Sequence, residues 1–207
     1  MRFLDETRPP HDLTYSDVFM VPGRSSVGSR LGVDLRTSDG VGTTIPLVVA
    51  NMTAIAGRRM AETVARRGAV AVIPQDIPVD VVGEVVAWVK ARHPVYDTAI
   101  TLPPTATIGE AMSLITKRAH GAVVVVDGDQ VVGILTERDT SGHDRFTQLR
   151  EVMSHDPFCV EAGMEPPKIY DRLTEARVPA APVVEAGRLV GIVTRTAALR
   201  STLYAPA

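Results

Sequence analysis

Between residues 45 and 89, apolar residues occur both in short continuous runs and at helical spacing. Residues 45–51 form a continuous apolar run, which predicts a strand buried on both faces, and residues 69–73 predict a second strand. Between them, apolar side chains recur at helical spacing over residues 60–65, and Gly68 suits the end of that helix. The valines of residues 81–89 predict a second amphipathic helix. The charged residues expected on the outside of the first helix are Arg58, Arg59, Glu62 and Arg66. The order strand, helix, strand, helix indicates the start of a parallel α/β fold.

The second half of the chain contains an internal repeat. Residues 120–134 and residues 178–192 each have a β-branched run, a tight acidic or glycine turn and a second apolar run. With Gly133 aligned to Gly191, the two copies match without a gap at an offset of 58 positions (191 − 133). Each copy is typical of a β-hairpin.

A helix is predicted before each hairpin. In the first copy Thr107 and Glu110 fit a capping box, and apolar residues follow at helical spacing. In the second copy Pro166 and Pro167 suit a first helical turn, where no amide donor is needed. Each unit is therefore read as helix, strand, strand, helix. Because neither copy alone can bury both faces of its hairpin, the two copies are expected to stack.

A polar segment after each second strand carries candidate chemistry. Gly133, Thr136 and Asp139 place a hydroxyl and a carboxylate at a strand-to-helix junction, where free amides can hold a phosphate and the acid can accept from ribose hydroxyls. The alternative is that Thr136 and Asp139 only cap the following helix. The segment resembles the CBS-domain signature Gly-x-x-Thr-x-x-Asp, which implies that adenine or guanine nucleotides bind between paired domains. The second copy keeps Thr194 but has Ala197 in place of the acid, so we expect one strong site rather than two.

Composition narrows the possible partners. The 207 residues are 45% hydrophobic and 22% charged, with a formal net charge of −2, so no basic excess favours nucleic acid. No stretch approaches the roughly 18 apolar residues that span a membrane, and the acidic N-terminus is not a signal peptide. Cys159 is the only cysteine, which excludes an intrachain disulfide, and no histidine spacing suggests a metal site. We therefore expect a cytoplasmic chain that contacts neither nucleic acid nor membrane.

Three parts of the N-terminal half resemble the IMP dehydrogenase and GMP reductase family. The matching residues are 13–22, 33–35 and the first strand. The catalytic domain of this family is a (β/α)8 TIM barrel that a pair of CBS domains interrupts after the second helix. The resemblance implies an α/β fold: a partial barrel, its first two βα units, with an inserted tandem CBS (Bateman) module of α+β type. Since such barrels need about 250 residues, we expect the chain to be a piece of a longer enzyme. The expected division is residues 1–94 for the barrel, 95–152 and 153–200 for the CBS domains, and 201–207 for the return to the barrel.

Two segments resemble the reductase branch of the family. Residues 24–30 are similar to an Arg-Ser-x-x-x-Ser-Arg segment whose Ser-Arg pair contacts NADPH, which implies that Ser29 and Arg30 bind the cofactor. A guanidinium suits a ribose phosphate because it donates two hydrogen bonds in a fixed geometry. Residues 50–52 are similar to the reductase Ala-Asn-Met, which implies substrate contact at the carboxyl end of the first strand. A solvated loop and strand-end packing are the alternatives. The implied substrate-binding residues are Ala50, Asn51 and Met52.

The resemblance implies a purine nucleotide oxidoreductase as the parent protein. The preferred reading is a GMP reductase that converts GMP to IMP and ammonia with NADPH, and the alternative is an IMP dehydrogenase that converts IMP to XMP with NAD. Thr53 and Gln75 depart from the aspartate and lysine usual in reductases. A third reading is a nucleotide-sensing module without catalysis. The family uses a cysteine nucleophile, and Cys159 does not match its position, so the chain is expected to hold no catalytic residue and to be inactive alone.

The same resemblance implies the partners. Purine nucleotides (GMP, IMP, ATP or GTP) are expected as ligands, and the full-length protein is expected to form a homo-tetramer or octamer. A monovalent cation such as K+ is expected only in the part of the barrel that this sequence does not contain.

Overall fold

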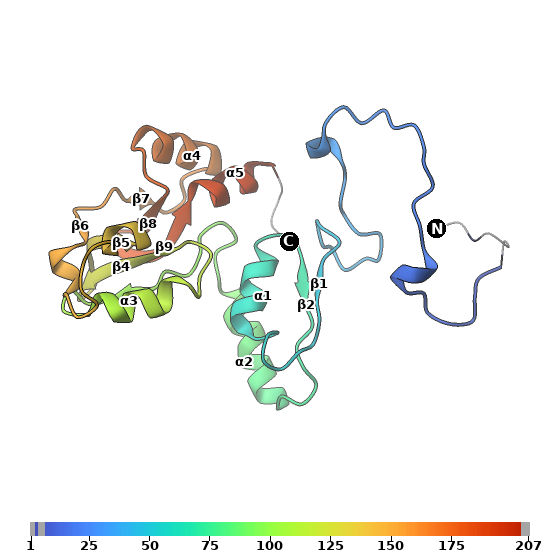
Figure 1. Cartoon of the computed structure of the whole chain (residues 1–207), viewed down its shortest axis with the longest axis horizontal. Helices are drawn as coiled ribbons and strands as arrows, with labels where there is room; N and C mark the ends of the chain where they lie inside the picture. Colours follow the sequence, from blue (N-terminus) through green and yellow to red (C-terminus); the bar gives the residue numbers. More distant parts are fainter. Residues whose placement is uncertain (1–2, 4–6, 204–207) are drawn as a thin grey trace. The chain divides into compact units, whose positions relative to one another are not determined.

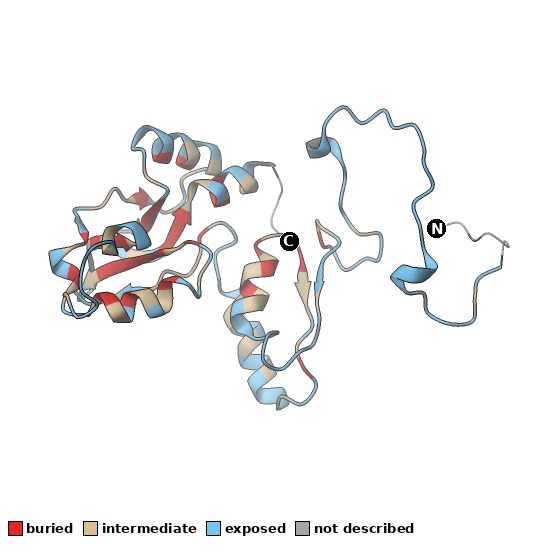
Figure 2. Ribbon diagram, in the orientation of Figure 1, coloured by how far each residue is buried: buried red, intermediate tan, exposed pale blue. Residues whose placement is uncertain are grey.

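The computed structural model describes residue 3 and residues 7–203, which divide into an N-terminal unit ending at Asp34 and a larger unit beginning at Leu35 (Figure 1). The N-terminal unit contains two 3-10 turns, η1 (Tyr15–Asp17) and η2 (Arg30–Gly32). Thr14 caps η1 by donating its backbone N–H and its hydroxyl to the Asp17 carboxylate, each at 2.7 Å. Most described side chains of this unit are exposed (Figure 2).

The larger unit begins with the strand–helix–strand–helix order that the apolar pattern predicts. The elements are β1 (Val48–Val49), α1 (Arg58–Ala65), β2 (Val70–Ala71) and α2 (Val79–Lys90). The two strands pair in parallel, and α1 packs against β2 and α2. Gly68, with φ of +82°, turns the chain from α1 into β2, and a Cβ there would lie 1.7 Å from the Thr44 hydroxyl. Only glycine fits this turn.

Two burial expectations for this segment are wrong. The strand around residue 48 is short and not buried: Val48 is 64% exposed, and β1 pairs only with β2 in the described sheet. Conversely, Glu62 and Arg66 of the α1 region lie inside the molecule, 1% and 7% exposed. Their burial is possible because the two side chains hydrogen-bond to each other and Glu62 also lies near Arg118.

The first repeat folds around a four-stranded sheet. It runs β3 (Thr101–Leu102), α3 (Ile108–Ile115), β4 (Ala122–Asp127), β5 (Gln130–Thr136), η3 (Glu137–Thr140), η4 (Leu149–Glu151) and β6 (Ser154–His155), with sheet order β3-β4-β5-β6. The predicted capping box is present, since Glu110 N donates to Thr107 Oγ1 and Thr107 N donates to Glu110 Oε2. The expected closing helix is wrong: it is only the 3-10 turn η3, which ends where Ser141 takes an extended conformation with ψ of 127°.

The second repeat has the same hairpin with a full closing helix. It runs β7 (Val160–Glu161), α4 (Pro166–Glu175), β8 (Ala180–Glu185), β9 (Arg188–Thr194) and α5 (Arg195–Leu203). Both predicted hairpins are confirmed, and each has a bulge at the same place, after Val125 and after Val183. Of the predicted return segment, residues 201–203 continue α5 and residues 204–207 lie outside the described residues.

The segment before each repeat pairs with a strand of the other repeat, and we call residues 96–98, before the first repeat, the lead-in. Before the first repeat, Asp97 pairs antiparallel with Ile192 of β9, and before the second repeat β6 pairs antiparallel with β5. Gly133 and Gly191 permit these approaches. A Cβ on Gly133 would lie 2.4 Å from Met153 Sδ, and one on Gly191 would lie 3.0 Å from the Asp97 carbonyl oxygen. The repeat glycines therefore make room for the crossing segments.

Strand alternation distributes the core over three clusters. Val123 and Val125 of β4 face α3, whereas Ala122 and Val124 face the other repeat and meet Ala180 and Ile192. The third cluster lies beneath α4 and α5 and includes residues Val160, Leu173, Ala181, Val183 and Ala197. The expected stacking of the two repeats is thus present. Over the described residues, no helix has the length and apolar character needed to cross a membrane.

Candidate functional site

The first candidate site lies where β5 ends. Thr136 donates its backbone N–H and its hydroxyl to Asp139 Oδ2, each at 2.7 Å, so the threonine and the acid cap η3 together. Asp139 Oδ1 accepts no hydrogen bond from the described residues, and the Asp139 side chain is partly exposed. Gly133 is buried beneath Met153 and serves packing. Thr136 and Asp139 therefore do cap η3, and the cap uses only the Oδ2 atom of the carboxylate.

The matching position of the second repeat has a different chemistry. Here the Thr194 hydroxyl accepts a hydrogen bond from the Ala197 backbone N–H at 3.0 Å and caps α5. Ala197 is 2% exposed and belongs to the core under α4 and α5. The second copy therefore lacks the acid and has also used its position for packing.

A buried ionic cluster joins α1 to the segment that leads into the first repeat. Glu62 Oε1 accepts hydrogen bonds from Arg66 Nη1 and from the Thr98 hydroxyl, both at 2.5 Å. Glu62 Oε2 lies 3.6 Å from Arg118 Nη1, just after α3. Arg66 also donates from Nε to the His93 carbonyl at 2.8 Å, and its Nη1 lies 3.7 Å from Asp97 Oδ1. We call Glu62, Arg66, Thr98 and Arg118 the joint.

The joint keeps Glu62 ionised. Burial raises the pKa of its carboxyl, but hydrogen bonds from Thr98 and Arg66 and the charges of Arg66 and Arg118 outweigh burial, so the pKa is lowered overall. Sequence reasoning missed this cluster because it placed the charged residues of α1 in solvent. The only available signal was the Glu62–Arg66 spacing of four residues, which surface helices share.

A cavity of about 560 Å³ opens beside the joint. Arg66, Arg92 and His93 line one side of it, and Gly163 and Gly191 of the second repeat line another. Its lining contains none of the residues predicted to bind a nucleotide. The lead-in also lines the cavity, whereas the Thr136–Asp139 turn does not.

Two loops meet at the carboxyl end of β1 and β2. Residues 50–52 follow β1 in a tight turn in which the Met52 N–H donates to the Ala50 carbonyl at 2.8 Å, and all three residues are exposed. The Thr53 hydroxyl donates to Asp76 Oδ2, in the loop after β2, at 3.2 Å. The predicted substrate residues thus lie at the edge where barrel enzymes bind substrate.

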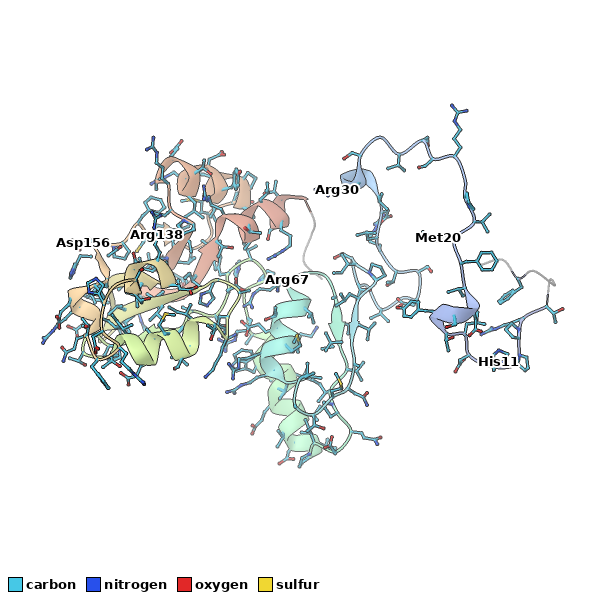
Figure 3. The ribbon with its side chains drawn as sticks, in the orientation of Figure 1. His11, Met20, Arg30, Arg67, Arg138 and Asp156 are labelled. Atoms are coloured by element: carbon cyan, nitrogen blue, oxygen red, sulfur yellow. The ribbon has the colours of Figure 1, made fainter. Side chains whose placement is uncertain are left out.

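Ser29 and Arg30 belong to the N-terminal unit, so their geometry is local. Both are exposed, and the backbone N–H of Gly32 donates to the Ser29 carbonyl at 3.0 Å to close η2. Figure 3 labels Arg30 at this turn, where its side chain is exposed.

Cys159 lies next to a strand and not within it. It lies one residue before β7 and is half-buried, with Sγ 3.3 Å from the Pro157 carbonyl. Burial, and then the charge of Glu161, raises the pKa of its thiol, which disfavours a thiolate nucleophile.

Comparison with known proteins identifies the family of the chain. Residues 12–194 match the family model described as IMP dehydrogenase / GMP reductase domain. The whole chain is 52% identical to a protein named GMP reductase from Mycobacterium tuberculosis H37Rv, and it spans 43% of that protein's length. A protein named inosine-5'-monophosphate dehydrogenase from Methanocaldococcus jannaschii is 32% identical over 92% of the chain, and the match covers 39% of that protein.

A solved structure has the same fold. The crystal structure of GMP reductase from Trypanosoma brucei in complex with guanosine 5'-triphosphate superposes with a TM-score of 0.60 at 24% identity, over 97% of this chain and 50% of that one. At this level of identity the likeness concerns the fold alone.

Proposed function

Because the chain belongs to the IMP dehydrogenase and GMP reductase family, we propose that it is part of a GMP reductase that converts GMP to IMP and ammonia with NADPH. One observation carries the proposal: identity is 52% over the full chain to proteins named GMP reductase, against 32% to the M. jannaschii dehydrogenase. The chain spans about 43% of those reductases, so the activity belongs to the longer protein. In it, β1–α1–β2–α2 forms the first two units of a TIM barrel, and residues 95–152 and 153–200 form the inserted CBS pair.

In this proposal the exposed edge after β1 contacts the substrate. Ala50, Asn51 and Met52 touch the purine, and the Thr53–Asp76 hydrogen bond holds their loop against the loop after β2. Ser29 and Arg30 bind the NADPH phosphate, for which an exposed guanidinium is suited, and NAD is the alternative cofactor.

The CBS pair acts as the nucleotide sensor of this enzyme. Thr136 and Asp139 bind a purine nucleotide such as GTP, ATP, GMP or IMP, with the free Oδ1 receiving a ribose hydroxyl. Thr194 forms a second, weaker site, because Ala197 brings no charge to it. The GTP complex of the T. brucei reductase makes GTP the first ligand to try. The assembled enzyme is a homo-tetramer or octamer.

The activity is tested on the complete enzyme that contains this chain. We expect NADPH oxidation with GMP and no NAD reduction with IMP. Activity only in the second assay would make the enzyme an IMP dehydrogenase. No activity in either, with nucleotide binding intact, would leave a sensing module.

Nucleotide binding is tested with Asp139→Ala. Removing the carboxylate should weaken GTP binding by about 10- to 100-fold, since a hydrogen bond to a charged group contributes about 1.5–3 kcal/mol. Isothermal titration calorimetry on this chain measures both affinity and stoichiometry, and we expect one strong site. Asp171→Ala, at an exposed position of α4, is the matched control. Equal affinity in all three proteins would mean that Asp139 is only a helix cap.

A further inference from the structure

The joint lies at the only described place where α1 meets the lead-in of the first repeat through buried charge. Glu62 is 1% exposed, yet it contacts three separate segments: its own helix through Arg66, the lead-in through Thr98, and the turn after α3 through Arg118. An isolated buried carboxylate is costly, so these partners must stay in place while Glu62 is charged. The positions of α1 and of the lead-in therefore depend on each other.

The lead-in is tied in turn to the second repeat. Asp97 donates its N–H to the Ile192 carbonyl at 2.8 Å and accepts from the Ile192 N–H at 2.9 Å. The Tyr96 hydroxyl accepts from the Gly163 N–H at 3.0 Å. Ile192 lies two residues before Thr194 on β9. One short segment therefore contacts both α1 and the strand that ends at the second nucleotide position.

The other end of α1 adjoins the proposed substrate loop. The Ala61 N–H bonds to the Gly57 carbonyl at 3.0 Å, and the Ala56 N–H bonds to the Met52 carbonyl at 2.8 Å. A shift of α1 along its axis would therefore move the turn that carries residues 50–52. Helices transmit such shifts because they are stiff and their packed interfaces have discrete arrangements.

We propose that Glu62 is a positioning residue that couples the CBS pair to the barrel: the joint carries movements of the lead-in to α1 and so to the loop of residues 50–52. The coupling itself depends only on the geometry of the joint. Its use in regulation rests on the proposed nucleotide-sensing function.

The first experiment tests the coupling without any nucleotide. Glu62→Gln keeps the size of the side chain but removes the charge that Arg66 and Arg118 share. We expect amide hydrogen exchange at Asp97 and Ile192 to become about 10- to 100-fold faster, as loss of a charge-assisted contact implies. Glu84→Gln, at an exposed site of α2, is the matched control and should leave these rates unchanged.

If Glu62→Gln does not fold, a less disruptive variant can be used in its place. Thr98→Val removes only the hydroxyl that donates to Glu62 Oε1 and keeps the shape of the side chain. Amide hydrogen exchange in β8, which does not contain Ile192, reports whether the second repeat is folded. The coupling is overturned if amide hydrogen exchange in the lead-in is as slow in Glu62→Gln and Thr98→Val as in the Glu84→Gln control.

The second experiment adds GTP to the same proteins. In the unmodified chain GTP should slow exchange both near Thr136 and in α1. In Glu62→Gln it should still slow exchange near Thr136 but no longer in α1, a result that a merely structural role would not give. Slowing in α1 that survives the substitution would overturn transmission through Glu62. If GTP, ATP and GMP protect no amide of the unmodified chain, the sensing function fails, and the first experiment still decides the coupling.

Discussion

Two threonines at equivalent positions show how single residues make the two repeats chemically different. Thr136 donates its hydroxyl to a carboxylate, whereas the Thr194 hydroxyl accepts from a backbone amide. The sequence alone predicted that the second site lacks its acid. It could not predict that Ala197 has become part of the core, because a single alanine carries no periodic signal.

This difference predicts the result of restoring the signature with Ala197→Asp. We expect the free energy of unfolding to fall by more than about 2 kcal/mol, because the new carboxylate would lie among apolar side chains without a partner. Urea denaturation of the chain measures the change. Ala197→Ser, which adds a small neutral group, should cost less. An Ala197→Asp protein of full stability with a second strong GTP site would contradict this view of the position.

Charged residues in helices were the least predictable part of the candidate site. Glu62 and Arg66 satisfy the pattern of a surface ion pair, and only contacts with Thr98 and Arg118, distant in the chain, distinguish the buried pair from it. Figure 3 labels Arg67, which follows Arg66 just after the end of α1. Local sequence cannot report such contacts.

At the scale of elements, prediction succeeded where local signals were strong. The hairpins of β4–β5 and β8–β9 and the capped helix α3 were all predicted, since turns, β-branched runs and caps act within a few residues. The pairing of the lead-in with the second repeat was not predicted, because the contact between Asp97 and Ile192 is a tertiary one. The short η3 was also missed, since tertiary context sets where a short helix stops.

The crossing segments predict opposite effects for the same substitution at two glycines. Gly191→Ala should lower the free energy of unfolding by about 1–3 kcal/mol, because its Cβ would lie 3.0 Å from both the Asp97 carbonyl oxygen and Tyr96 Cβ. Gly83→Ala, in open space within α2, should raise it by about 0.5–1 kcal/mol through helix propensity. Thermal melting of both variants measures the contrast. Equal effects of either sign would mean that the lead-in does not approach Gly191 so closely.

At the scale of the whole molecule, the folded structure depends on two histidines being neutral. His93 Nδ1 accepts from the backbone N–H groups of Val95 and Tyr96, at 3.1 and 3.3 Å, and its ring stacks on Tyr96. His120 Nδ1 accepts from the Ala122 N–H at 3.3 Å. Burial, then the charge of Arg66, lowers the pKa of His93. Burial also lowers the pKa of His120; Arg118 adds to this, and Asp97, the Thr98 carbonyl and Glu62 oppose it without reversing it.

Stability should therefore fall as the pH drops from 7.5 to 5.5. Unfolded histidine has a pKa of about 6.5, so the unfolded chain takes up protons in this window while the folded chain resists them, and proton uptake favours unfolding. Carboxylates titrate at lower pH and contribute little here. Urea denaturation at several pH values measures the slope. In a His93→Asn, His120→Asn double variant, the amide oxygen can replace Nδ1 as acceptor without titrating, so the slope should flatten. A slope that is unchanged in the double variant, or a stability that rises toward pH 5.5, would show that other groups control the acid response.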